Sequence, residues 1–229
     1  MNRKMAIEKL VPKDLRILKA AEEVFSHKGY HNSTLDEIVK IADTGKGTVY
    51  KYYKNKEMLF YTLMSQKNDQ FMKDLNQVYN SSTAFTDRFM GFFRTMVEFM
   101  DENKVLWSVL FFEILGVSGG WQLHWNSEKQ NYDVEVNWGP APSQKDVEMK
   151  TRYADIIRGE IKILIDILNG GEKEGFLRPN PDVGIMAQNM YFSLMCMIMQ
   201  GCLTKDKRDE VLSSFLDRFL YGHILRKNK

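Results

Sequence analysis

The residues whose types suit nucleic-acid contact gather in one short stretch, from Lys46 to Lys56. Helical spacing would bury Val49 and Tyr53, four residues apart, and leave the opposite side of the stretch facing outward. That side combines ammonium groups for phosphates, hydroxyls that reach phosphates or base edges, and a glycine that lets the backbone approach a groove wall. We predict a DNA-binding set of Thr34, Lys46, Gly47, Thr48, Tyr50, Lys51, Tyr52 and Lys56. The alternative is a solvated basic surface with incidental tyrosines.

The preceding residues form the helix and turn that would position this stretch. An apolar stripe at i, i+3, i+4 and i+7 predicts a short helix, and its members are Leu35, Ile38, Val39 and Ala42. Thr34 and Glu37 have the spacing of a capping box, which places the start of the helix. The turn follows at Asp43, a residue type that tolerates the left-handed conformation. Two short helices joined by such a turn favour a DNA-binding unit over a merely basic surface.

Two further helices should complete and extend this unit. The first is expected over residues 13–28, with Gly29 as its C-terminal stop. After the basic stretch, Asn55 can cap a helix that begins at Lys56 and continues toward Tyr79. Lys56 would then hold a phosphate jointly with the backbone N–H groups of that helix start. This helix is longer than a DNA-binding head needs, so we expect it to link the head to the rest of the chain.

The segment from about Asp14 to Phe60 resembles the DNA-binding domain of the tetracycline-repressor (TetR) family of transcriptional regulators. The resemblance rests on the order and spacing of TLDEIVKIA, KGTVYKYY and NKEMLF. It covers roughly a quarter of the chain. Three adjacent positions depart from the family pattern: Asp43 replaces a usual glycine, Thr44 an apolar residue and Gly45 a serine. Gly45 has no side chain for the phosphate contact often made in relatives.

Charge is unevenly distributed along the 229 residues. Residues 1–60 hold twelve Lys and Arg against eight Asp and Glu, a net charge of +4, whereas the whole chain is only +2. The remaining chain is therefore net −2, and a basic head on a body that is not basic is expected when the head alone meets phosphate. The two cysteines, Cys196 and Cys202, lie in one apolar segment and indicate a reduced protein rather than a disulfide or metal framework.

Targeting signals and membrane spans are not expected. The first twelve residues carry charges throughout, so they indicate a basic N-terminal arm (1–12) rather than a secretion signal. The most apolar run, 191–203, is too short to cross a bilayer. We therefore expect a cytoplasmic protein, with no membrane partner, organised as the arm, a helix-turn-helix domain at 13–55 and a body at 56–229.

The body is expected to be helical, which makes the fold class all-α: a three-helix head and a larger helical ligand-binding and dimerisation body. Residues 85–100 and 103–115 predict two helices that are apolar on nearly every side, as expected of a buried core or a cavity wall. Three further helices are expected: one from about 145, one from Asn180-Pro181 and one over 207–225. Gly170 and Gly171 would end or loosen the first of these, or it would continue to Gly175 as similar proteins do.

The middle helices supply a candidate effector pocket. Its predicted residues, drawn from the Phe- and Trp-rich segments, are Phe89, Phe93, Trp107, Phe111, Glu113, Trp121 and Trp125. Glu113 lies in an apolar helix, so it must be paired or hydrogen-bonded; a structural ion pair or an exposed position is the alternative to a ligand contact. Aromatic stripes at helical spacing also occur in plain cores.

Residues 116–143 lose helical periodicity and hold three of the four tryptophans. A loop this long within a compact body is usually functional or disordered, and the aromatics argue for order. We expect an insertion with a short extended piece near 132–138 that packs over the body, either as a lid on the ligand cavity or against a partner subunit. The isolated His124 is expected to be polar surface, with no metal site.

The last two helices suggest a homodimer, which the family resemblance also implies. Packed against their copies they would form a four-helix bundle, with predicted contacts from Met190, Leu194, Phe215, Leu216 and Phe219. Two heads related by a two-fold axis would favour a palindromic double-stranded operator. The alternative is a stripe buried within one subunit.

The sequence thus predicts a DNA-binding repressor that a small, largely apolar effector releases from its operator. No catalytic triad, glycine-rich phosphate loop or metal-spaced cluster stands out, so we do not expect an enzyme, and no cofactor is predicted. A constitutive or architectural DNA-binding protein without an effector is the main alternative.

Overall fold

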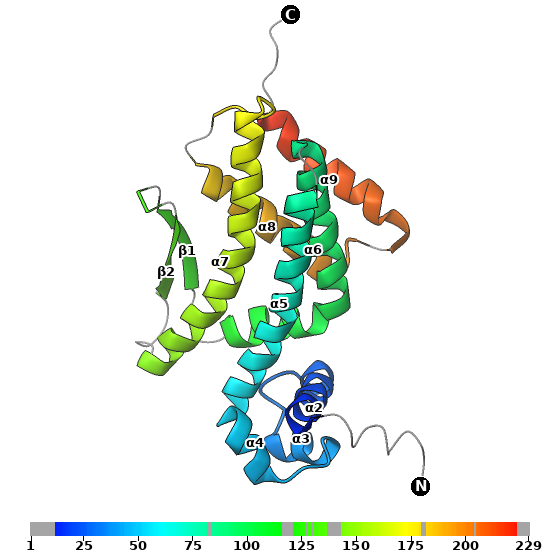
Figure 1. Cartoon of the computed structure of the whole chain (residues 1–229), viewed down its shortest axis with the longest axis vertical. Helices are drawn as coiled ribbons and strands as arrows, with labels where there is room; N and C mark the ends of the chain where they lie inside the picture. The colour runs from blue at the N-terminus through cyan, green and yellow to red at the C-terminus, as the bar shows by residue number, and fades with distance from the viewer. Residues whose placement is uncertain are drawn as a thin grey trace, which may run out of the picture. The chain divides into compact units, whose positions relative to one another are not determined.

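The computed structural model describes residues 12–81, 84–115, 121–126, 128–129, 131–136, 143–179, 182–203 and 205–223. The described residues fall into two compact units (Figure 1). The head unit contains those within 1–69 and 105–117, and the body unit those within 70–104 and 118–229. Helices dominate both units, which confirms the predicted helical class. No described helix is long and apolar enough to cross a membrane.

The head unit begins with α2 (Lys13–Lys28), α3 (Leu35–Ile41) and α4 (Lys46–Tyr53), followed by the start of α5 (Lys56–Ser81). The predicted bounds of these helices are confirmed to within a residue or two. The apolar stripes meet in one core, in which Ile17, Phe25, Ile38 and Val49 have no exposed surface. The Phe25 and Phe60 rings meet edge to face with centroids 5.0 Å apart, so α5 closes the core over α2.

The turns between these helices follow local capping rules. Gly29 ends α2 with φ 75°, and its N–H donates to the Phe25 carbonyl. Asp43 adopts φ 48°, which confirms the left-handed turn and explains why glycine suits this position in relatives. The Asn55 Oδ1 atom accepts the Met58 N–H at 2.7 Å, so Asn55 caps α5 as predicted. Lys54, with φ 62°, is a second left-handed residue that the sequence did not indicate.

The helices that were expected at 85–100 and 103–115 meet at a kink. α6 spans Phe85–Ser108 with a non-helical backbone at Asn103, and a π-helical segment, η1, follows at Val109–Leu115. The non-helical backbone at Asn103, whose side chain donates to the Phe99 carbonyl, therefore lies at the boundary that the sequence predicted between the two helices. The part of α6 up to Lys104 belongs to the body unit, and the remainder with η1 belongs to the head unit.

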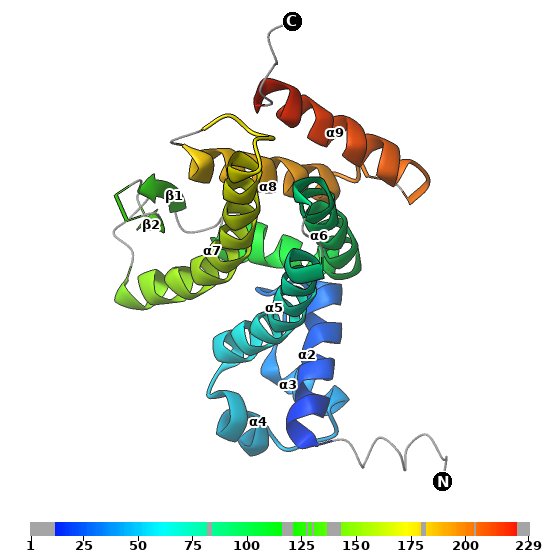
Figure 2. The same cartoon turned by 45° about the horizontal axis from the view of Figure 1, so that its top comes forward.

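The rest of the body unit consists of α7 (Gln144–Lys173), α8 (Val183–Met199), a 3-10 turn η2 (Lys205–Lys207) and α9 (Arg208–His223). α7 continues through Gly170 and Gly171, and the chain turns at Gly175 with φ 77°. α7 packs against α8, and these two helices cross in the view of Figure 2. Residues 180 and 181, where α8 was expected to open, lie outside the described residues; the observed N-cap is Asp182.

The insertion contains a β-hairpin, the one departure from an all-helical architecture in the described part of the chain. Strands β1 (Trp121–Asn126) and β2 (Asn131–Val136) are antiparallel, with Trp121 opposite Val136 and Asn126 opposite Asn131. The Asn126 amide donates to Asp133 at 2.8 Å, which fixes the turn end of the ladder. β2 contacts α7. The expected extended piece near 132–138 is thus one half of a hairpin.

Candidate DNA-binding surface

Helix α4 is fixed to the head by one face. Val49 is fully buried and Tyr53 is 7% exposed, as their spacing predicted. The Tyr53 hydroxyl donates to the Asp14 carbonyl oxygen at 3.0 Å. Burial raises the pKa of Tyr53 to about 12, so the phenol keeps the proton that this hydrogen bond requires. The orientation of α4 about its own axis is therefore determined by α2.

The opposite face of α4 is open. Tyr50 and Tyr52 are 47% and 50% exposed, and Lys46, Gly47 and Lys51 are exposed beside them, with Thr48 half-buried. A Cβ atom added at Gly47 would meet nothing within 4 Å. Packing within the head therefore does not require glycine here. Glycine also weakens a helix by about 1 kcal/mol relative to alanine, so its presence needs another reason. The structure thus brings together on one cationic and phenolic surface the predicted residues Lys46, Gly47, Thr48, Tyr50, Lys51 and Tyr52.

Acidic residues border this surface, which the sequence reasoning missed. The Lys46 ammonium lies 2.8 Å from the Asp36 carboxylate of α3, and both side chains are largely exposed. This hydrogen bond and the charge of Asp36 raise the pKa of Lys46. Arg16 and Asp43 lie 3.8 Å apart across α2 and the turn. Lys46 is therefore held in place by a carboxylate that a phosphate would have to replace.

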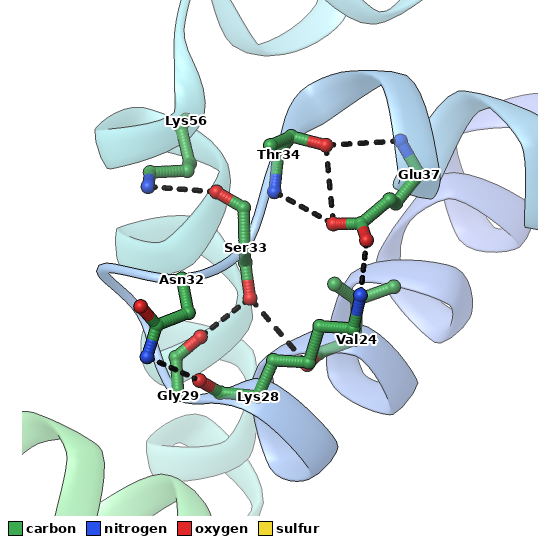
Figure 3. A network of polar contacts seen from close by, with 8 residues as sticks. All are labelled: Val24, Lys28, Gly29, Asn32, Ser33, Thr34, Glu37 and Lys56. Atoms are coloured by element: carbon green, nitrogen blue, oxygen red, sulfur yellow. Dashed lines mark hydrogen bonds and ion pairs between the residues drawn. The ribbon is translucent and has the colours of Figure 1, made fainter.

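Lys56 bonds inside the head. Its Nζ atom donates to the carbonyl oxygens of Tyr30 at 2.8 Å and Ser33 at 2.9 Å, and lies 4.4 Å from the centroid of the Tyr30 ring. The ammonium thus holds the α2–α3 turn against the start of α5 (Figure 3). A structural role is the alternative to the phosphate contact, which stays a prediction. Nothing in the local sequence signals bonds to residues more than twenty positions earlier.

Thr34 belongs to the same polar network (Figure 3). Its Oγ1 accepts the Glu37 N–H at 3.3 Å, and the Glu37 carboxylate accepts the Thr34 N–H at 3.0 Å, which confirms the capping box. The Lys28 ammonium also bonds Glu37, and with the Thr34 bonds it lowers the pKa of this carboxyl. Thr34 therefore sets the start of α3, and its DNA contact stays a prediction.

The described residues of the predicted effector pocket belong to both units, and the pocket stays a prediction. Phe89 and Phe93 are fully buried in the body unit, with ring centroids 5.1 Å apart. Trp107, fully buried, and Phe111, half-buried, belong to the head unit. The side chains of Glu113, Trp121 and Trp125 lie outside the described residues. A buried carboxyl that the sequence reasoning passed over, Glu160, lies in α7 among Ile157, Ile161 and Leu164; a charged residue in an apolar stripe was its signal.

The predicted dimerisation residues divide by exposure. Met190, Leu194 and Leu216 are buried within the single chain, whereas Phe215 and Phe219 are half-buried with ring centroids 4.9 Å apart. On the outer side of α8, Ile185 is 44% exposed, Phe192 half-buried and Cys196 exposed. Their spacing of seven and four residues follows one helical stripe. An apolar stripe of α8 is therefore partly exposed among the described residues.

Comparison with known proteins is consistent with this geometry. Residues 17–62 match the model of the family described as bacterial regulatory proteins, tetR family. The fatty acid metabolism regulator protein of Bacillus subtilis (strain 168) is 24% identical over 89% of this chain and 90% of that protein. The HTH-type regulator YhgD of the same organism is 42% identical over 25% of this chain and 34% of that protein.

The fold also resembles that of solved regulators. In the crystal structure of the transcriptional regulator FadR from Bacillus subtilis in complex with stearoyl-CoA, the matching chain has a TM-score of 0.68 at 22% identity. The match covers 91% of this chain and 98% of that one. Residues 17–62 thus match the tetR family of bacterial regulatory proteins, and the chain as a whole has the fold of solved regulators such as FadR.

Proposed function

We propose that this chain is a homodimeric transcriptional repressor that binds a palindromic operator through α4 and leaves it when a small, largely apolar effector binds the body. The observation that carries the proposal is the open face of α4, whose opposite face is fixed in the head core. Because a DNA-binding regulator works where the chromosome is, the proposal includes a cytoplasmic location.

On this proposal the exposed side chains of α4 contact both the phosphates and the bases of DNA. Lys46 and Lys51 neutralise phosphates, and the hydroxyls of Thr48 and Tyr50 reach phosphates or base edges. Because Gly47 has no side chain, the helix backbone can approach the duplex closely at this position. DNA contact would therefore explain a glycine that packing within the head does not require. Phosphate contacts make the affinity fall steeply with salt.

Dimerisation would use the partly exposed apolar stripe of α8 together with α9. Burying Ile185, Phe192 and Cys196 against a second copy removes apolar surface from water, which favours association. The Arg208 guanidinium lies 2.7 Å from the Asp101 carboxylate and ties the start of α9 to α6. A two-fold axis between the bodies would present the heads to successive major grooves, about 34–36 Å apart or at a multiple of that distance.

The names of the relatives suggest the effector class. One relative is named for fatty acid metabolism, and FadR was solved with stearoyl-CoA. A long-chain acyl-CoA is therefore the first candidate for the apolar effector. Its binding would shift α5, which runs from the head unit into the body unit, and change the distance between the heads. Release requires the ligand to bind the DNA-incompetent form more tightly.

A constitutive DNA-binding protein is the second candidate, and the packing of the body favours it. Phe89, Phe92 and Phe93 are fully buried, and their rings contact one another at 5.1 and 5.2 Å. An operator selected from genomic fragments distinguishes the two functions in a fluorescence anisotropy titration. Release of the operator by stearoyl-CoA supports the effector-responsive repressor. Operator binding that neither stearoyl-CoA nor other acyl chain lengths alter would contradict it and leave the constitutive reading.

A further inference from the structure

Glu160 is a carboxyl in the interior of the body unit. It lies in α7 with no exposed surface, and the hydroxyl of Tyr191, from α8, donates to its Oε2 atom. The Oε1 atom is also buried and has no hydrogen-bond partner among the described residues. A pair that served the fold alone would be expected to satisfy both oxygens, because an unpaired buried polar atom is costly.

Burial also determines the protonation of this pair. Desolvation raises the pKa of Glu160 to about 8, against a smaller lowering by the hydrogen bond from Tyr191. The pKa of Tyr191 is raised well above its ordinary value by burial and by the adjacent carboxyl. At neutral pH the phenol therefore keeps its proton and donates a hydrogen bond to Oε2. The carboxyl proton then resides on Oε1, as an O–H donor without an acceptor in the described protein.

The surrounding face of α7 carries polar and apolar side chains in one line. Lys150, Tyr153, Ile157 and Glu160 follow one another at steps of three, four and three residues, and all are buried. This stripe rises roughly 15 Å along the helix. Polar and apolar side chains therefore share one interior face, a combination also found in sites that orient a mostly apolar ligand by a few polar contacts.

We infer that the Oε1–H group of Glu160, held by Tyr191, donates a hydrogen bond to an uncharged carbonyl oxygen of the effector. The ligand class is an apolar chain bearing an ester, thioester or ketone. A neutral carbonyl is favoured over a free carboxylate, because burying a charge costs more than burying a hydrogen-bonded neutral group. This inference rests on the proposed effector-responsive function and names the chemistry of that site.

The test compares two ligands that differ only in the carbonyl. Stearoyl-CoA has a thioester C=O, and S-octadecyl-CoA replaces it with a methylene. Calorimetric titration of the full chain without DNA should show wild type binding stearoyl-CoA roughly tenfold more tightly, the discrimination expected of one buried hydrogen bond. Glu160→Gln keeps an N–H donor and should retain the preference. Glu160→Leu should bring the ratio of the two affinities close to one.

Controls separate this effect from misfolding. Glu98→Leu replaces an exposed carboxylate on α6 and should keep the wild-type ratio. Glu160→Leu combined with Tyr191→Phe leaves no phenol unpaired, and its thermal melt reports whether the fold is intact. A thioester preference that survives in the folded double variant, or equal affinities in wild type, overturns the inference but not the repressor. Failure of wild type to bind either ligand overturns the inference and the acyl-CoA effector together, while operator binding separately tests the repressor.

Discussion

Replacing Glu160 by glutamine should remove a pH dependence of stability that the wild-type body carries. The folded chain holds the carboxyl proton with a pKa of about 8, whereas the ordinary value is 4.5. Between these values the folded state keeps a proton that the unfolded state has released, so the free energy of unfolding falls as pH rises. The contribution is fully present below pH 4.5 and is lost as pH rises through 8.

The size of the effect follows from the width of this window. Each pH unit between the two pKa values removes about 1.4 kcal/mol. From pH 4.5 to pH 7 the wild type should lose roughly 3 kcal/mol from this group. Glutamine has nearly the same shape, accepts the same hydrogen bond from Tyr191 and carries no charge at any pH. The stability of Glu160→Gln relative to wild type should therefore rise by that amount over the same range.

Urea unfolding at a series of pH values measures this difference. Protein concentration must be held constant, because a dimer's apparent stability depends on it. Glu98→Gln, which removes an exposed carboxylate from α6, is the matched control, and its difference from wild type should change much less with pH. If the difference in unfolding free energy between Glu160→Gln and wild type stays constant from pH 4.5 to pH 7, the Glu160 carboxyl is not held protonated in the folded body.

Three further substitutions test the head and the body. Lys56→Ala should destabilise the head by about 1–2 kcal/mol, because two carbonyl acceptors lose a charged donor. It should also weaken binding to operator and scrambled duplexes equally. Unchanged urea unfolding would argue against the hydrogen bonds from Lys56 to Tyr30 and Ser33. Asp36→Asn should release Lys46 and raise DNA affinity roughly two- to fivefold at low salt. A drop in affinity would instead show that the Asp36 carboxylate orients Lys46 for DNA binding. Gly91→Ala should lower the free energy of unfolding by roughly 1–3 kcal/mol, since the added Cβ would lie 2.5 Å from Val78 Cγ1. An unchanged thermal or urea melt would show that α5 and α6 shift to accommodate the methyl group.

The local features of the head could be predicted because they depend on near neighbours. Thr34 and Glu37 are three residues apart, Gly29 and Asp43 adopt the left-handed conformation at helix ends, and Val49 and Tyr53 lie on one face of a short helix. Each follows from helical spacing or from backbone preference. The surface of α4 was therefore visible in the sequence.

The missed features depend on residues far apart in the chain. Lys56 bonds carbonyls that precede it by more than twenty positions, and Glu160 meets Tyr191 from the next helix. No periodic pattern encodes such a pair. The β-hairpin was predicted only in part, although apolar and polar residues alternate along both β1 and β2, which is the pattern of a half-buried strand.

The central claim is that the open face of α4 binds DNA, and one anisotropy experiment tests it most directly. Lys46→Ala and Tyr50→Ala are titrated against a selected operator at several salt concentrations, beside Lys162→Ala, an exposed lysine of the body. Both α4 variants should lose roughly tenfold or more in affinity, and Lys46→Ala should lower the salt slope by about one. All three proteins should elute identically on sizing chromatography, and Lys162→Ala should bind as wild type does. Unchanged affinity in both α4 variants would contradict the claim.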